Sequence, residues 1–279
     1  MKLLNSPGIA EQVNVNAVQV YAIVQDRSGR YVSGLNAEDF LVKEDGKTVT
    51  PRLQSGKDDP ISIGMALDTS SSMQISMTEV IDYANEFVMK ALGEADQTFV
   101  VSFDEEPRLV QPLTRNRREI SAAIFDLTAN GGTAIWDAVL YSLQQFRGVP
   151  GKRALVVFTD ADNNSGLATA NGALQYAREI GVPVYVVQIF TGLHQNLQMT
   201  FDENAIENLT RATGGAFFRF AGKRNLPYIF SQIRDDTRGQ YLLTYVSPAA
   251  KSHGELRRIS VEVPRRGVAV RATSGYYPK

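Results

Sequence analysis

The sequence of 279 residues contains no cysteine and only two histidines, His194 and His253. The lack of cysteine excludes disulfides, thiolate zinc sites, iron–sulfur clusters and cysteine nucleophiles. It does not identify the compartment, because exported proteins can also lack cysteine. Two histidines are too few for a multi-histidine metal site, and both stand in polar segments without a catalytic partner in view. A metal or catalytic site in this chain must therefore use other side chains.

The chain also has no excess of charge: 29 lysine and arginine residues stand against 30 aspartate and glutamate residues, for a formal net charge of −1. No global field therefore attracts nucleic acid or an anionic membrane. No apolar run approaches the ~20 residues that span a bilayer, and residues 1–4 are followed by polar residues instead of a signal-peptide core. We expect no nucleic-acid partner, no membrane insertion and binding through a local site.

Alternating apolar residues predict short strands at both ends of the chain. They extend from residue 12 to about residue 62, with turns predicted at 26–29 and at 44–47, where Asp-Gly suits a type I′ hairpin. After residue 239 strands return, at 241–246, 256–263 and 268–272. We expect the N-terminal segment 1–60 and the C-terminal segment 239–279 to pack together as one small all-β domain.

Between residues 61 and 238 the pattern changes to strands that alternate with helices. Short apolar runs predict buried strands at 61–67, 99–103, 154–158, 182–189 and 216–218. Apolar residues spaced three and four apart predict helices near 77–92, 120–127, 135–146, 170–180, 203–213 and 226–237. This alternation predicts an α/β fold, a doubly wound and mostly parallel sheet covered on both faces.

Oxygen-bearing side chains follow the predicted strands at the edge where open α/β sheets bind ligands. The candidate metal ligands are Asp68, Ser70, Ser72, Thr133 and Asp160. Alternate positions in the tight loop 68–72 can direct three oxygens to one side. Hydroxyl and carboxylate oxygens suit a small hard cation such as Mg²⁺. Neutral hydroxyl ligands leave such a cation electrophilic, so a site of this kind recruits a carboxylate from a partner.

These motifs resemble the von Willebrand factor A-type domain: Asp-x-Ser-x-Ser at 68–72, Gly-Gly-Thr ending at Thr133 and Phe-Thr-Asp ending at Asp160. The resemblance covers roughly residues 60–237 and implies a Rossmann-like domain over 61–238 with a metal-ion-dependent adhesion site. In that site Ser70, Ser72 and Thr133 would bind the metal directly, and Asp68 and Asp160 directly or through water. The implied cofactor is Mg²⁺, with Mn²⁺ or Ca²⁺ as alternatives.

The flanking segments are similar to those of a bacterial group of A-type-domain proteins that are often exported, so an extracytoplasmic location is implied. One departure is Ala161, where many relatives carry glycine after the aspartate. It leaves the geometry of the adjoining loop open. The following Asp-Asn-Asn, residues 162–164, could rim the site but is more typical of a plain turn.

The leading functional hypothesis is a metal-dependent protein-binding module for adhesion or scaffolding, in which a protein partner supplies an Asp or Glu to the metal. The chain is then not an enzyme. One alternative is a Mg²⁺-dependent, phosphatase-like hydrolase, because an aspartate after the first buried strand resembles the haloacid dehalogenase-like phosphatases. That chemistry needs a second acid two positions later, where this chain has Ser70. A purely architectural domain, in which the metal ties three loops together, is the other alternative.

Simpler explanations apply to several features. Asp-x-Ser-x-Ser alone is also typical of a helix cap, and only the three loops together favour a metal. Trp136, the single tryptophan, is expected to anchor the core. Residues 257–279 contain six basic residues against one acidic residue, Glu262, which predicts a solvated sheet face.

Overall fold

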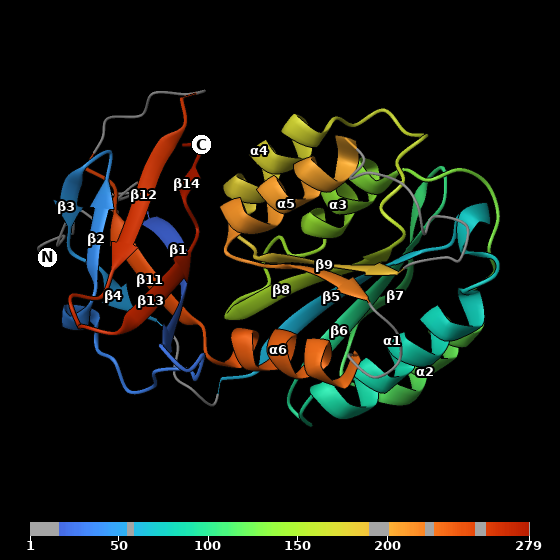
Figure 1. Cartoon of the computed structure of the whole chain (residues 1–279), viewed down its shortest axis with the longest axis horizontal. Helices are drawn as coiled ribbons and strands as arrows, with labels where there is room; N and C mark the ends of the chain where they lie inside the picture. The colour runs from blue at the N-terminus through green and yellow to red at the C-terminus, as the bar shows by residue number, and fades with distance from the viewer. Residues whose placement is uncertain (1–16, 55–58, 190–200, 221–225, 249–254, 279) are drawn as a thin grey trace, which may run out of the picture.

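The structure, a computed structural model, describes residues 17–54, 59–189, 201–220, 226–248 and 255–278. The predicted start of the first strand at residues 12–16 lies outside these ranges, and so do His194 and His253. Two parts of the chain lie side by side in Figure 1, a small part made only of strands and a larger α/β part.

A six-stranded sheet forms the centre of the larger part, in the order β10-β9-β8-β5-β6-β7. Its strands are β5 (Ile61–Asp68), β6 (Gln97–Phe103), β7 (Pro107–Thr114), β8 (Lys152–Thr159), β9 (Val184–Ile189) and β10 (Phe217–Phe220). All neighbours pair in parallel except β7, which runs antiparallel to β6. Every residue of β5, β8 and β9 is buried, as expected for strands covered on both faces.

Helices cover both faces of this sheet (Figure 1). They are α1 (Met77–Ala91), α2 (Arg117–Phe125), α3 (Ile135–Gln144), α4 (Ala170–Ile180), α5 (Phe201–Thr213) and α6 (Leu226–Arg238). The apolar sides of α1, α2 and α6 pack on one face, and those of α3, α4 and α5 pack on the other. The predicted doubly wound α/β fold is confirmed.

The strands of the two flanking segments combine into two four-stranded sheets, β13-β1-β11-β4 and β14-β12-β2-β3. From the N-terminal segment come β1 (Ala17–Asp26), β2 (Leu41–Glu44), β3 (Lys47–Val49) and β4 (Arg52–Leu53), with a short 3-10 helix, η1 (Ala37–Asp39). From the C-terminal segment come β11 (Tyr241–Val246), β12 (Arg257–Glu262), β13 (Val268–Ala272) and β14 (Gly275–Tyr276). A shared apolar core joins the strands of both segments into one all-β unit, the β domain.

The predicted Asp-Gly hairpin connects β2 and β3. Asp45 and Gly46 have φ angles of 46° and 80°, the left-handed conformation that a type I′ turn requires at both positions. The turn at 26–29 also forms, because the amide of Gly29 bonds to the carbonyl of Asp26 at 2.9 Å.

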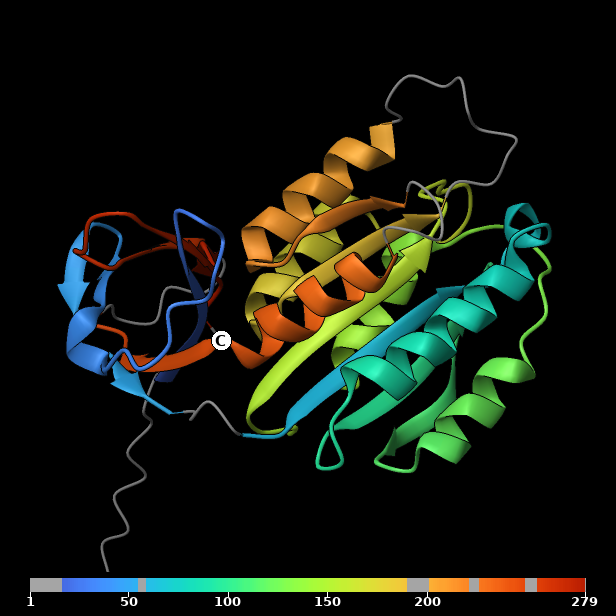
Figure 2. The same ribbon diagram turned by 60° about the horizontal axis from the view of Figure 1, so that its bottom comes forward.

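Polar side chains join the β domain to the amino ends of the central strands. Arg153, near the start of β8, donates from Nε to the Tyr21 hydroxyl at 2.9 Å, and that hydroxyl donates to the carbonyl of Gly151 at 2.9 Å. Asp236 of α6 accepts from the Tyr31 hydroxyl at 2.5 Å and pairs with Arg271 of β13. Figure 2 shows the β domain at one end of the sheet and the loops after the parallel strands at the other.

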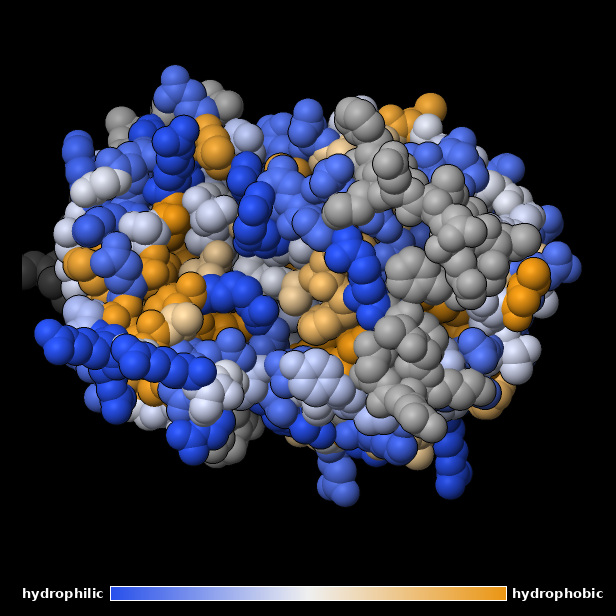
Figure 3. Space-filling view, in the orientation of Figure 1, coloured by the Kyte–Doolittle hydropathy of each residue, from blue (hydrophilic) through white to orange (hydrophobic). Residues whose placement is uncertain are grey.

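Charged and apolar residues alternate over the face that Figure 3 shows. Within the described part of the chain, no helix combines the length and the apolar composition needed to cross a membrane.

Candidate functional site

Four of the five candidate residues lie at or after the carboxyl ends of β5 and β8, and the fifth, Thr133, lies in the loop before α3. Strand β5 pairs with β6 on one side and with β8 on the other, so the chain leaves the ends of β5 and β8 toward opposite faces. Open α/β sheets bind ligands at such a point. Asp68 is the last residue of β5, and Asp160 directly follows β8.

Asp68 is a fully buried carboxylate with both oxygens bonded. Oδ1 accepts from the backbone amide of Ser70 at 2.9 Å, and Oδ2 accepts from the hydroxyl of Thr159 at 2.6 Å. Burial removes the charged form from water and raises the pKa of Asp68 to about 7, and the nearby carboxylate of Asp160 adds to this shift. A cation placed beside Asp68 would oppose that shift and keep the carboxylate charged.

Ser70 and Ser72 direct their hydroxyls to one another. Their Oγ atoms lie 3.0 Å apart, where a short 3-10 helix, η2 (Ser71–Met73), begins. The intervening Ser71 is exposed, and Thr69 turns its hydroxyl away to donate to the carbonyl of Phe103 at 3.0 Å. The serine hydroxyls form no side-chain cap on η2, so the helix-cap interpretation of this motif does not describe the structure.

Thr133 belongs to a second loop that is tied to the first through the backbone. The amide of Ser71 donates to the carbonyl of Gly131 at 3.0 Å, and the amide of Asn130 donates to the carbonyl of Thr69 at 2.7 Å. Thr133 itself is 1% exposed, and its hydroxyl Oγ1 is buried without a hydrogen-bond partner. This hydroxyl is therefore available to a ligand.

Asp160 contributes a second buried oxygen without a hydrogen-bond partner. The residue is 9% exposed, and its Oδ1 accepts from the amide of Asp162 at 3.3 Å. Its Oδ2 is buried without a partner. Most buried carboxylate and hydroxyl oxygens in proteins have a hydrogen-bond partner, so these two atoms at the switch point are available to a ligand.

The donor set fits a hard divalent cation and few other groups. It consists of carboxylate and hydroxyl oxygens, which Mg²⁺ prefers. Across the described residues, no cluster of three or more aspartate, glutamate, histidine or cysteine side chains forms. A site here therefore depends on the hydroxyls of Ser70, Ser72 and Thr133 as much as on Asp68 and Asp160.

Side chains of the Asp-Asn-Asn segment, which the sequence alone favoured as a plain turn, hold the Thr133 loop in place. Asn164 accepts from the amide of Thr133 at 2.8 Å, and Asn163 accepts from the amide of Ile135 at 2.9 Å, at the start of α3. Asp137 accepts from the amides of Leu167 and Ala168, both at 3.0 Å. The Asp-Asn-Asn segment is thus more than a turn. The sequence did show two asparagines soon after Asp160, but the backbone amides that they bind lie about 30 residues earlier in the chain.

Ala161 adopts the left-handed conformation, with φ at 68°. Its amide donates to the hydroxyl of Thr159 at 3.1 Å, the same hydroxyl that bonds to Asp68. Glycine reaches this conformation without steric cost, which explains the residue expected here from the resemblance.

The fold and the position of the candidate site define an open α/β protein with its binding edge at the sheet's switch point. The chain belongs to the von Willebrand factor type A domain family, whose sequence model matches residues 63–232. No curated protein matches the sequence significantly.

Several solved structures share the fold. The conserved hypothetical protein BatB from Bacteroides thetaiotaomicron is 18% identical, with a TM-score of 0.50, over 63% of this chain and 98% of that one. A von Willebrand factor type A protein from Catenulispora acidiphila is 15% identical, with a TM-score of 0.56, over 96% and 64%. A D319A mutant of the PilB minor pilin from Streptococcus sanguinis is 14% identical, with a TM-score of 0.52, over 67% and 64%. The matched part of this chain thus corresponds to less than two thirds of the last two proteins.

Proposed function

We propose that the chain is a non-catalytic protein-binding module in which a divalent cation, Mg²⁺ first, recruits a carboxylate of a partner protein. The observation that carries this proposal is the pair of buried oxygens without a partner, Thr133 Oγ1 and Asp160 Oδ2, beside the switch point. A cation at this place gives both oxygens a partner and offsets the cost of burying Asp68.

The five candidate residues would hold the cation, with Ser70, Ser72 and Thr133 as neutral ligands. Asp68 and Asp160 would balance its charge, directly or through water. When bound, the cation supplies Lewis acidity toward an incoming oxygen ligand, and an Asp or Glu side chain of the partner is the ligand of matching charge. Mn²⁺ and Ca²⁺ accept the same oxygens.

The loops around the site are fixed by hydrogen bonds between their backbones. The first loop is bonded to the Thr133 loop, and Asn164 is bonded to Thr133 in turn. Ligands that are already held in place lose little conformational freedom when they bind, so the affinity for the cation and for the partner is higher. This arrangement supports a binding role.

An exposed leucine stands on the loop after Asp160. Leu167 is 97% exposed, although its amide is held by Asp137 and Gly166 before it has a φ of 91°. A single exposed apolar residue is ordinary on a protein surface. A leucine displayed on an anchored loop that follows the site aspartate, however, is suited to contact an apolar residue of a partner that also reaches the metal.

Catalysis has less support than binding. The position two residues after Asp68 holds Ser70, whose hydroxyl lies 3.0 Å from Ser72 and cannot act as the carboxylic general acid of a phosphatase. Among the structures of the same fold is a minor pilin, PilB from Streptococcus sanguinis. That likeness supports an interaction module over a hydrolase.

Pull-down of partners in buffer with Mg²⁺, compared with buffer containing EDTA, tests the proposal. We expect capture of a partner that EDTA and Asp160→Ala both abolish, while circular dichroism shows an unchanged fold. Capture that is equal with and without the metal would contradict metal-dependent binding and leave the architectural role. Hydrolysis of a generic phosphate ester that requires Mg²⁺ and is lost in Asp68→Asn would instead establish the enzyme alternative.

A further inference from the structure

A second candidate site lies in the β domain, which Figure 1 shows at the end of the molecule opposite the loops after β5 and β8. It is a pocket of about 390 Å³ between the turn that follows β1 and the turn that precedes β13. Its lining residues come from these two turns: Asp26, Arg30, Tyr31, Val32, Arg265, Arg266, Gly267 and Val268. The volume is within the range of ~300 to 1,000 Å³ that ligand sites occupy.

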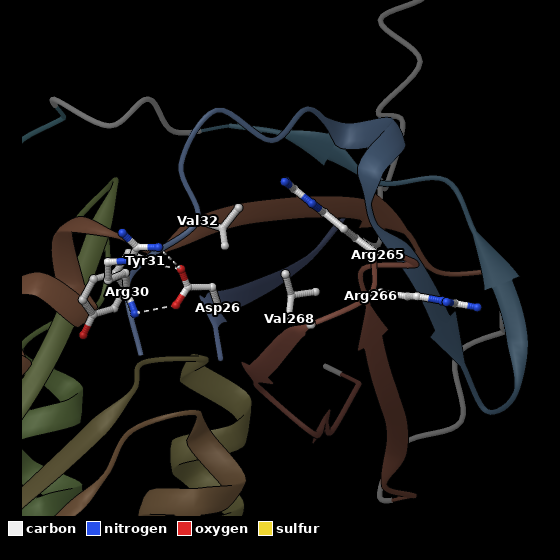
Figure 4. A pocket seen from close by; sticks show the side chains of 8 residues that line it. Asp26, Arg30, Tyr31, Val32, Arg265, Arg266 and Val268 are labelled. Atoms are coloured by element: carbon white, nitrogen blue, oxygen red, sulfur yellow. Dashed lines mark hydrogen bonds and ion pairs between the residues drawn. The ribbon is translucent and has the colours of Figure 1, made fainter. Parts of the chain in front are cut away.

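The pocket combines apolar side chains with a basic rim. Figure 4 shows Val32 and Val268 between Arg30 on one side and Arg265 on the other. The side chain of Arg265 extends over the pocket toward Val32, whereas that of Arg266 points away from it (Figure 4). Tyr31 forms part of the wall, and its hydroxyl is already used by Asp236 at 2.5 Å.

The single acidic residue of the pocket is occupied by its own turn. Asp26 accepts from the amide and the hydroxyl of Ser28, at 2.8 Å and 2.6 Å, and from Nε of Arg30 at 3.1 Å. Hydrogen bonds, above all the one from the Ser28 hydroxyl, hold the pKa of Asp26 well below its usual range, so this carboxylate stays charged. It therefore closes the turn and pairs with Arg30 instead of neutralising Arg265.

A further arginine approaches from the same turn. A Cβ atom added to Gly267 would lie 3.3 Å from Nε of Arg27, so Arg27 rests against Gly267 in the pocket wall. Gly267 has a φ of 81°, and both this conformation and the close contact favour glycine there. Within the described ranges, neither Arg27 nor Arg265 forms an ion pair with an acidic side chain.

The basic C-terminal run therefore has two different roles. Arg257 pairs with Asp45 at 2.9 Å, and Arg271 pairs with Asp236, so these arginines are structural. Arg265, in contrast, is exposed and directed over a pocket. Arg265 lies in the turn between β12 and β13, so it is not part of a sheet face.

Carboxylates are the ligands that fit this pocket best. The planar guanidinium group matches a carboxylate with two parallel hydrogen bonds. Nucleic acid and anionic membranes are poor candidates, because the chain has a net charge of −1 and Tyr31, the single aromatic residue of the pocket, is half-buried in the wall. The local charge suits a ligand with a few negative groups next to apolar ones.

An extended peptide fits the pocket better than a free small acid, because an edge strand of the sheet begins at the pocket. Val268 is the first residue of β13, an edge strand of its sheet, which pairs with β1 and with no other strand in the described part of the chain. Edge strands offer unpaired backbone groups to an extended peptide. We propose that this pocket binds an acidic peptide segment of a partner protein, with one carboxylate at Arg265, a second at Arg27 beside Gly267, and its backbone along the first residues of β13.

Fluorescence anisotropy with a labelled peptide of alternating glutamate and valine tests this inference. EDTA is present throughout, so the candidate metal site cannot capture the carboxylates. We expect saturable binding that weakens at least tenfold in Arg265→Ala and in Arg27→Ala. Arg266→Ala, which removes the same charge from the neighbouring position, should change the affinity less than threefold. The peptide with glutamine in place of glutamate should not bind.

Arg27, Arg265 and Arg266 are all exposed, so their alanine variants should retain the wild-type melting temperature. Three results would contradict the inference. Equal losses in Arg265→Ala and Arg266→Ala would show general charge attraction without a pocket. Binding of the glutamine peptide at full affinity would exclude carboxylate recognition. Displacement of the peptide by succinate, inorganic phosphate or phosphatidylserine vesicles at lower concentration than by unlabelled peptide would overturn the assignment to a protein segment.

Discussion

Asp68 shows how a single residue couples the candidate site to pH. Burial raises its pKa to about 7, so the carboxyl group carries a proton below that pH in the metal-free protein. A cation must displace this proton, and affinity therefore falls as the pH decreases through 7. We expect the affinity for Mn²⁺ to decrease from pH 8 to pH 5.5, approaching tenfold per pH unit at the acidic end. Calorimetric titration across this range measures it, and a constant affinity would argue against Asp68 as a ligand.

Ala161 tests the backbone conformation beside Asp160. A β-branched residue is strained at a φ of 68°, and the site is only 2% exposed, so Ala161→Val should lower the free energy of unfolding by about 2 kcal/mol. In Ala161→Gly the relief of backbone strain is offset by the loss of a buried methyl group and by the greater freedom of the unfolded chain. We expect the free energy of unfolding to change by less than about 1 kcal/mol. Urea unfolding measures both. Equal stability of the valine variant and the wild type would contradict the left-handed conformation.

At the scale of elements, the segment from Asp160 to Ala168 positions a residue on a different loop. Asn164→Ala removes the acceptor of the Thr133 amide, so we expect Mn²⁺ affinity to fall by about 10- to 100-fold, as for other residues that orient a metal ligand. Asn85→Ala is the matched control, because among the described residues the Asn85 side chain has a single hydrogen bond, to the carbonyl of Ile81 within α1. The same loss of affinity in both variants, measured by calorimetry, would count against a specific role for Asn164.

The elements themselves could largely be predicted, because apolar periodicity reports burial. The helix predicted at 170–180 matches α4, and the strand predicted at 241–246 matches β11. The antiparallel edge strand β7 was missed. Six of its eight residues are half-buried, without a strong apolar pattern, and it contains Pro112, which a strand tolerates at a sheet edge. Partners distant in sequence, such as Asn164 and Thr133, follow from no local pattern.

At the scale of the whole molecule, buried polar contacts couple the β domain to the α/β part. Asp236 is 1% exposed and bonds to Tyr31 and Arg271, both from the β domain. Asp236→Ala leaves these groups without their acceptor, and we expect a loss of about 3 kcal/mol in the free energy of unfolding. The neighbouring Asp235→Ala removes a pair with Arg234 whose side chains are 35% and 37% exposed, and should cost less than about 1 kcal/mol.

Thermal unfolding of these two variants compares them directly. If Asp236→Ala and Asp235→Ala melt at the same temperature, the contacts of Asp236 do not hold the domains together. The sequence indicated that the two terminal β segments pack with each other, since both alternate in the same way. Nothing in the sequence identified Asp236 as the residue that links the β domain to the α/β part, because an aspartate in the last turns of a helix is usually a surface residue.

The proposed metal site at the switch point depends on carboxylate and hydroxyl oxygens from three loops. Calorimetric titration of Mn²⁺ into the whole chain tests it most directly, with Asp160→Ala and Thr133→Ala as variants and the fluorescence of Trp136, three residues after Thr133 in the core, as a second signal. We expect one cation per chain and a loss of at least tenfold in affinity for each variant, with the fold retained. Undetectable binding to the wild type, or equal binding by wild type and both variants, would contradict it.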